Sequence, residues 1–290
     1  MSDASRASVT SSSGPIRAVH GITLGEVQVR PKNIEGTGTP MLWWTLTART
    51  WSPWLPVLAF VIEHERGTVL FDTGQSPDSL TDPDYYPGGM LGWVYRRQAR
   101  FRVPAEQTLP AQLAALNLTP SDITHVALSH LHQDHAGNLE PFTDVPVYVA
   151  PAELALLEQK TPELHGVLAA RIPPPGVTLT PVPFSDASAT DAADGVDLFG
   201  DGTLTLLPTP GHSAGSMSLL IRRPDAAPLL LVGDVTYDPA LLWRGIVPDV
   251  GDRRAQLETA TSLARLRDAH PSLRVLAAHD PNALTLLTSP

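Results

Sequence analysis

The sequence predicts an α/β protein in which helices flank two mixed β-sheets. Apolar runs of strand length recur along the whole chain, and segments of helix length lie between them. The 29 prolines and 21 glycines supply many turns, and a hydrophobic content of 42% over 290 residues is enough for a large core. No linker divides the chain, so we expect residues 16–290 to form a single domain after a polar, disordered leader at 1–15.

The first third of the chain favours strands. Residues 17–30 alternate apolar and polar side chains around glycines, which is typical of a β-hairpin. A second strand pair is expected at 57–63 and 68–73, on either side of a short turn. Residues 41–54 hold four of the six tryptophans. Residues 81–103 are rich in glycine and aromatics, and we expect a long excursion there without a regular element.

Helices and strands alternate in the middle of the chain. A helix is predicted over 106–117, beginning near Pro110, because proline suits the first helical turn. The apolar residues 123–129 then predict a buried strand. Residues 145–150 predict another strand, with a helix over 151–158 directly after it.

The last third begins with a loop-rich stretch. Residues 173–202 are rich in proline, aspartate and glycine and are expected to contain one short strand. Strands are then predicted at 204–212, 217–223 and 228–234, the first two of them paired, followed by a helix at 252–269 and a strand at 273–280.

Composition excludes several classes of function. The net charge of −10 and the pI of about 5.4 disfavour binding to nucleic acid or to an anionic membrane. The longest apolar run, residues 54–62, is too short to span a bilayer, so we expect a cytoplasmic protein. Cysteine is absent, so any metal must be held by histidine and carboxylate side chains.

A dense cluster of metal-ligand types follows the strand at 123–129. His130, His132, Asp134 and His135 lie within six positions. Residues two apart on extended backbone point to the same side, so His130 and His132 can reach one ion. An isolated histidine is usually structural, but four ligating groups exceed what one tetrahedral ion takes from one loop. We therefore expect two adjacent ions.

Three more candidate ligands follow apolar strands further along the chain. His212, Asp234 and His279 each come just after such a strand. Side chains at the ends of several strands converge at one edge of a sheet, where open α/β sheets build their sites. We expect all three to join the cluster.

The order HxHxDH, then histidine, aspartate and histidine, resembles the metallo-β-lactamase superfamily, whose fold is an αββα sandwich with a two-metal hydrolytic centre. The resemblance extends from residues 70–74 to residue 279. It implies that Asp234 bridges the ions and that Asp72 supports the HxHxDH motif from behind the ligands. It assigns one ion to His130, His132 and His212, and the other to Asp134, His135 and His279. Zinc is the natural ion for such nitrogen and oxygen ligands, although cobalt, iron or manganese would also fit.

Features outside the metal ligands narrow the reaction. The absence of cysteine excludes β-lactamases with a cysteine ligand, and a bridging Asp234 argues against the other di-zinc β-lactamases. Flavin-dependent diiron relatives carry glutamate where this chain has His132, and nucleases of this fold usually need a basic surface.

Tyr237 lies three residues after Asp234, and this spacing resembles the N-acyl-homoserine lactonases, the quorum-quenching branch. Residues 55–64 and the His-Asp pair at 279–280 resemble that branch as well. The resemblance implies that a hydroxide bridging the two ions attacks the lactone carbonyl and opens the ring. Tyr237 would donate a hydrogen bond to the developing oxyanion, and Asp134 would carry a proton to the leaving oxygen. The alternative for Tyr237 is a packing role.

Two other functions stay open at this point. A phosphotriesterase of the same superfamily would share the ligand set, with organophosphates as substrates. A non-catalytic sensor could keep the fold, but such a protein has little physical reason to retain all seven ligands.

The large apolar side chains of residues 41–54 and 81–103 have two interpretations. They line the pocket for the acyl chain of the substrate, or they form the interface of a homodimer, because aromatic side chains are favoured at both. The expected pocket residues are Met41, Trp43, Trp44, Trp51, Trp54, Tyr86 and Trp93, and Tyr85, Met90 and Tyr95 lie near them in the sequence.

Overall fold

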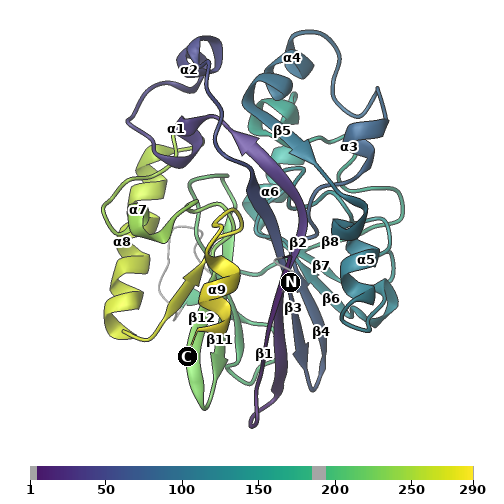
Figure 1. Cartoon of the computed structure of the whole chain (residues 1–290), viewed down its shortest axis with the longest axis vertical. Helices are drawn as coiled ribbons and strands as arrows, with labels where there is room; N and C mark the ends of the chain where they lie inside the picture. The colour runs from purple at the N-terminus through teal and green to yellow at the C-terminus, as the bar shows by residue number, and fades with distance from the viewer. Residues whose placement is uncertain (1–4, 185–193, 290) are drawn as a thin grey trace.

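Two mixed β-sheets pack face to face, with helices on both outer faces (Figure 1). The computed structural model describes residues 5–184 and 194–289. The larger sheet has the order β1 (Arg6–Thr10), β2 (Ile16–Val29), β3 (Leu55–His64), β4 (Gly67–Phe71), β6 (His125–Ala127), β7 (Val147–Val149) and β8 (Leu179–Pro181), with β5 (Ala99–Arg102) paired to β2. The smaller sheet has the order β13 (Arg274–Leu276), β12 (Ala226–Leu231), β11 (Met217–Arg223), β10 (Leu204–Pro208) and β9 (Val196–Asp197).

Helices cover the outer faces of the sheets and the end of the molecule drawn at the top of Figure 1. Those given in the described ranges are α1 (Pro31–Ile34), α2 (Met41–Thr47), α3 (Asp78–Thr81), α4 (Gly89–Gln98), α5 (Leu109–Ala114), α6 (Pro151–Leu157), α7 (Pro239–Leu242), α8 (Arg253–Ala269) and α9 (Ala283–Thr288). Short 3₁₀ turns lie at Ala105–Gln107, Pro120–Asp122 and Pro162–His165. No helix in the described ranges is long and apolar enough to cross a membrane.

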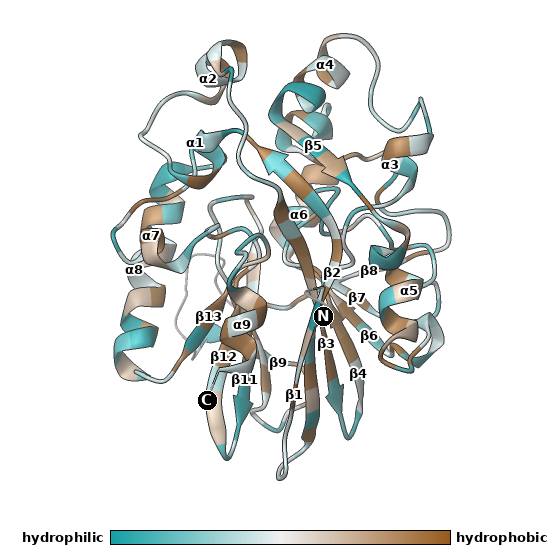
Figure 2. Cartoon of the chain, in the orientation of Figure 1, coloured by the Kyte–Doolittle hydropathy of each residue, from teal (hydrophilic) through white to brown (hydrophobic). Residues whose placement is uncertain are grey.

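Alternation along the strands explains the four layers. In β3, Leu58, Phe60 and Ile62 point into the layer between the sheets. Ala59 and Val61 point to the opposite face, where α5 and α6 pack. Successive side chains of a strand point to opposite faces, so a strand that is apolar at every position must be covered on both sides. Figure 2 shows these strands as mainly hydrophobic, and the αββα sandwich predicted from the sequence is confirmed.

The smaller sheet follows the same rule. Leu219 and Ile221 of β11 enter the layer between the sheets, and Leu220 between them points outward to the cluster beneath α8. The partner strands are antiparallel around β11, whereas β12 and β13 are parallel. In the larger sheet β4, β6, β7 and β8 are parallel, and the strands on the other side of β4 are antiparallel.

The expected hairpin at 17–30 is instead the single 14-residue strand β2. The glycine that suggested a turn, Gly25, takes a φ of +114° within the shift of register between Thr23 and Glu26. Such a residue marks a β-bulge that bends a strand without reversing it. The strand therefore continues and pairs with β5 beyond the bend.

The prediction of a disordered leader is wrong over Arg6–Thr10, which forms β1; residues 1–4 lie outside the described residues. Its register to β2 is continuous, and Ala7 and Val9 pack against the layer between the sheets. Backbone pairing to an existing edge holds a polar segment that its composition alone would leave unfolded.

The excursion expected at 81–103 contains the helix α4 and the strand β5. Only Gly92 of α4 is buried, so the helix packs little of its surface into the core. Elsewhere the predicted strands at 57–63 and 68–73, the helix at 252–269 and the paired strands after residue 203 are confirmed.

Candidate metal centre

The candidate ligands lie in loops that follow strands of both sheets, at one edge of the sandwich. Residues 130–135 come after β6, and Asp72 comes directly after the neighbouring parallel strand β4. From the smaller sheet, His212, Asp234 and His279 follow β10, β12 and β13. The backbone N–H of Met217 donates to the carbonyl of Ser129 at 2.8 Å, which joins the two sets of loops.

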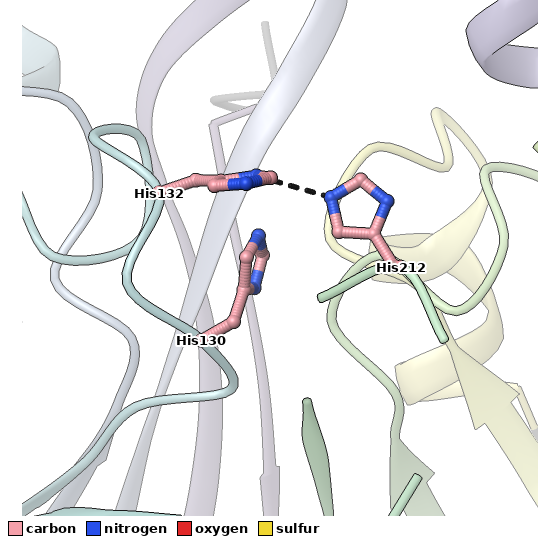
Figure 3. A group of neighbouring side chains, drawn as sticks. All are labelled: His130, His132 and His212. Carbon is pink, nitrogen blue, oxygen red and sulfur yellow. Dashed lines mark hydrogen bonds between the residues drawn. The ribbon is translucent and has the colours of Figure 1, made fainter. Parts of the chain in front are cut away.

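All seven predicted ligands meet there in three overlapping groups of three side chains. Within each group the ligand atoms lie within 4.8 Å of one another. Figure 3 shows the group of His130, His132 and His212, in which the His132 Nδ1 and His212 Nε2 atoms are 3.1 Å apart. The other groups are Asp134 with His135 and His279, and His130 with His135 and Asp234. The first two of these groups match the two sets that the family resemblance assigned to separate ions; the third group shares a residue with each.

Asp234 lies between the two sides of this cluster. Its Oδ1 atom is 3.2 Å from the Nε2 atoms of both His135 and His279. Its Oδ2 atom is 3.4 Å from His212 Nε2. One carboxylate thus reaches both predicted ligand sets, which is the geometry that a bridging ligand requires.

Most of the unpaired buried atoms of the cluster are atoms that a metal would use. The Nε2 atoms of His130, His135 and His279, and Oδ1 of Asp234, are buried without a hydrogen-bond partner. A buried polar atom without a partner is costly in a folded protein. These atoms converge on one small volume, so the residues fit a divalent cation or a pair of them.

Hydrogen bonds at the far side of three of the rings fix their orientation. Asp72 Oδ2 accepts from His135 Nδ1 at 2.9 Å, and Asp72 also accepts from the backbone N–H and the hydroxyl of Ser129. The carbonyl of Pro56 is 2.8 Å from His279 Nδ1, and the carbonyl of His165 is 3.0 Å from His132 Nε2. A carbonyl can only accept, so both rings carry their proton on that side and turn the lone pair inward.

Electrostatics divide the cluster into neutral and charged members. Burial lowers the pKa of His212 to about 3, so this ring is neutral. Burial opposes protonation of His135, but the Asp234 and Asp72 carboxylates outweigh it and raise the pKa well above its usual range. Burial opposes ionisation of Asp234, yet His279 and the other imidazoles hold its pKa well below the usual range. Asp234 therefore stays ionised.

Tyr237 stands beside this carboxylate. Its hydroxyl donates to Asp234 Oδ2 at 3.1 Å, and its ring stacks on His279 with centroids 5.0 Å apart. Burial, followed by the negative charges of Asp234 and Asp134, raises the Tyr237 pKa well above its usual value. The phenol keeps its proton and can act as a neutral hydrogen-bond donor.

Two adjoining cavities open at the cluster. The smaller, of about 100 Å³, is lined by ligands including Asp134 and Asp234, and by Tyr237. The larger, of about 880 Å³, has a mainly apolar wall, and both cavities are lined by His132 and His212. The apolar side chains of the larger wall include Met41, Leu91, Val94, Leu156, Leu164, Val250 and Ala255.

Of the seven pocket residues expected from the sequence, Met41 lines the larger cavity and the others line neither cavity. Trp43 and Trp93 are exposed, Trp44 is buried on α2, and Tyr86 packs against neighbouring tyrosines. Large aromatic size was a poor guide to the wall, which is formed by smaller aliphatic side chains.

The remaining two tryptophans are held by arginines. The Trp51 ring lies between the guanidinium groups of Arg30 and Arg100, 3.6 and 4.2 Å from its centroid. Arg102 lies 4.4 Å from the Trp54 centroid. Cation–π contacts of this kind stabilise the rings against β2 and β5 instead of leaving them free to bind a ligand.

Tyr95, one of the aromatic residues that the sequence offered for the pocket or the interface, lines both cavities. Sequence reasoning missed Gln98, Gly166 and Val250, which also line both. The signal that could have found α4 was the spacing of Leu91, Val94 and Gln98, three or four residues apart as on one face of a helix.

A family model described as the metallo-beta-lactamase superfamily matches residues 52–279. The chain belongs to the metallo-beta-lactamase superfamily. Among curated members, the N-acyl homoserine lactonase AttM of Azorhizobium caulinodans is 31% identical over 236 residues, which cover 79% of this chain and 83% of AttM. The N-acyl homoserine lactonase AiiB of Agrobacterium fabrum is 28% identical over 243 residues, covering 78% and 80% of the two chains.

Solved structures of other proteins share the fold. An N-acyl homoserine lactone hydrolase with the product N-hexanoyl-L-homoserine at its catalytic metal centre superposes with a TM-score of 0.71 at 21% identity, covering 94% of each chain. The dizinc quorum-quenching lactonase AidC, also in complex with a product, gives a TM-score of 0.61 at 15% identity over 96% of this chain and 92% of AidC.

A substitution at Gly166 tests whether the backbone must approach the candidate ligand His132 closely. A Cβ atom at this position would lie 2.3 Å from His132 Nε2, on a residue with a φ of +81°. We expect Gly166→Ala to displace the His132 ring and to lower metal occupancy, measured by elemental analysis of the purified protein. Gly202→Ala is the matched control, because Gly202 has the same φ and nothing within 4 Å of the added atom. Equal occupancy in the two variants would contradict the role of Gly166.

Proposed function

We propose that this protein is a metal-dependent hydrolase that opens the ring of N-acyl-homoserine lactones, a quorum-quenching reaction. The observation that carries the proposal is the pair of adjoining cavities at the candidate metal centre. The smaller cavity, with Tyr237 and the ligands, suits a polar lactone ring, and the larger apolar cavity suits an acyl chain. The relatives described above as lactonases support the same substrate class.

The proposed cofactor is a pair of divalent ions, zinc above all. His130, His132 and His212 would hold one ion and Asp134, His135 and His279 the other, with Asp234 between them. When bound, such ions supply a Lewis acid for the lactone carbonyl and lower the pKa of water at the site.

The side chains around the ions supply hydrogen bonding and proton transfer. The protonated phenol of Tyr237 turns from Asp234 to donate to the carbonyl oxygen of the lactone, whose negative charge grows as the water oxygen adds to the carbonyl carbon. Asp134 lines the smaller cavity, and its Oδ2 atom is 3.5 Å from His279 Nε2. Its carboxylate takes the proton of the attacking water and returns it to the ring oxygen that leaves.

The acyl chain lies in the larger cavity in this proposal. Leu91 and Val94 of α4, Leu156 of α6 and Ala255 of α8 line it, so three separate helices contribute to the wall. Each CH₂ group buried from water contributes about 0.8 kcal/mol to binding. The amide of the substrate then lies where the two cavities meet, near Tyr95 and Gln98.

The substrate class is tested by comparing kcat/KM for N-acyl-homoserine lactones of several chain lengths with kcat/KM for paraoxon. We expect the lactones to be preferred and longer chains to be favoured until the larger cavity is filled. More efficient hydrolysis of paraoxon would establish a phosphotriesterase instead. A protein that purifies without near-stoichiometric metal and turns over neither substrate would be a sensor.

Replacing Tyr237 by Phe tests the donor. Removing one donor to an oxyanion lowers kcat by about 10²–10³-fold in other hydrolases, and a fall of this order is expected here. Metal content should stay at the wild-type level, because the phenol is not among the ligands. Tyr148→Phe is the control, since that ring lies on β7 and stacks on His125. Unchanged kinetics in Tyr237→Phe would leave the tyrosine with a packing role only.

We further propose a homodimer that forms through α2 and α4. Exposed apolar side chains gather on both helices: Leu42, Trp43 and Leu46 on α2, with Met90 and Trp93 on α4. The Arg97 guanidinium of α4 donates to the carbonyls of Thr45, Leu46 and Ala48 at the end of α2, so the two helices form one surface. A patch of this kind is typical of a protein–protein interface.

Cytoplasmic location stays a prediction of the sequence.

The dimer is tested by size-exclusion chromatography coupled to light scattering, which gives the molar mass of the protein in solution. The wild type should elute as a dimer, and Leu42→Glu combined with Trp43→Glu should elute as a monomer, because buried unpaired charges oppose association. Leu257→Glu, at an exposed leucine of α8, is the control and should remain a dimer. A monomeric wild type would overturn the assignment.

A further inference from the structure

A fully buried carboxylate lies behind the candidate metal centre. Glu153, on α6, has no exposed surface. Its Oε2 atom accepts from the backbone N–H of Leu131 at 3.0 Å. Its Oε1 atom accepts from the backbone N–H of Gly215 at 2.9 Å and from the hydroxyl of Ser213.

These donors belong to the loop of residues 130–135, which supplies both ligand sets, and to the loop after β10, which supplies His212. Leu131 stands between His130 and His132, and Ser213 directly follows His212. The three histidines form the group drawn in Figure 3, named here the three-histidine site. One carboxylate therefore joins both halves of this site, with one oxygen on each loop.

The other ligand set is oriented from different places. His135 bonds to Asp72, and His279 bonds to the carbonyl of Pro56. Neither contact involves α6. Loss of the Glu153 carboxylate would remove its links between the loop of His212 and the loop of His130 and leave these two contacts in place.

The packing leaves little freedom around Glu153. A Cβ atom at Gly215 would lie 2.5 Å from the Glu153 backbone nitrogen, so the helix and the loop touch directly. Hydrogen bonds to a carboxylate are stronger than those between neutral groups, and buried N–H groups that lose an acceptor are costly. The two loops are thus held at a fixed separation.

We propose that Glu153 is a positioning residue that sets the distance between His212 and the pair His130 and His132. It thereby controls the affinity of the three-histidine site for its ion, independently of the second site. The proposal rests on the proposed metal centre but does not depend on a lactone as the substrate.

The test is Glu153→Gln in two backgrounds that each leave one site. His279→Ala impairs the second site and keeps the three-histidine site, and His212→Ala does the reverse. Zinc affinity of the full-length, metal-stripped proteins is measured by competition with a chromophoric chelator. Glutamine keeps the shape but places an NH₂ group against a donor. We expect Glu153→Gln to weaken zinc binding about 10–100-fold beside His279→Ala, as for other residues behind metal ligands. Beside His212→Ala it should change nothing.

Two further variants separate positioning from general loosening. Gln112→Ala removes a buried polar side chain of α5, whose Nε2 donates to the carbonyl of Glu106 at 2.6 Å, and should leave zinc affinity unchanged. Ser213→Ala deletes one of the three hydrogen bonds and should weaken the three-histidine site by less. It also provides the measurement if Glu153→Gln does not fold. Unchanged affinity of the three-histidine site, or equal loss at both sites, would overturn the proposal.

Lactone turnover is measured separately on the wild type. An inactive wild type with selective zinc loss in Glu153→Gln would overturn the proposed substrate and leave the role of Glu153 intact. An active wild type with unchanged zinc affinity in the variant would overturn the role of Glu153 alone.

Discussion

The apolar layer between the two sheets sets the position of every candidate ligand. Phe60 and Phe71 from the larger sheet meet Leu219 and Leu231 from the smaller one, all fully or almost fully buried. The sheets can slide relative to one another only by disrupting this layer, which is close-packed as in other protein interiors. Because the ligands leave both sheets at one edge, the packing that stabilises the fold also determines the distances at the centre.

The cluster of candidate ligands could be predicted from sequence because the spacing that forms it is local. His130 and His132 need only an extended backbone to point the same way. The other three candidates outside this loop, His212, Asp234 and His279, can be recognised because each follows an apolar strand. The pocket wall could not be predicted in this way. Its residues come from α4, α6, α8 and intervening loops, and their proximity depends on tertiary packing that leaves no mark in local composition.

The errors in the fold have a similar origin. Gly25 could mark a turn or a bulge, and only the register with β3 decides between them. The polar strand β1 exists because β2 offers an edge to pair with, which its own residues do not reveal. The tryptophans suggested a ligand pocket by their size. The Trp51 ring instead packs against the guanidinium groups of Arg30 and Arg100, and no regular spacing in the sequence indicates these contacts.

The way the ligands are distributed along the chain has a consequence for the whole molecule. The larger sheet comes from residues before 182 and the smaller sheet from residues after 195, and each predicted ligand set takes side chains from both portions. An ion in either set would therefore act as a cross-link between distant parts of the chain. Cross-links of this kind restrict the unfolded state, as disulfides do, and this chain has no cysteine to form any. The metal would then also stabilise the packing of the two sheets against each other.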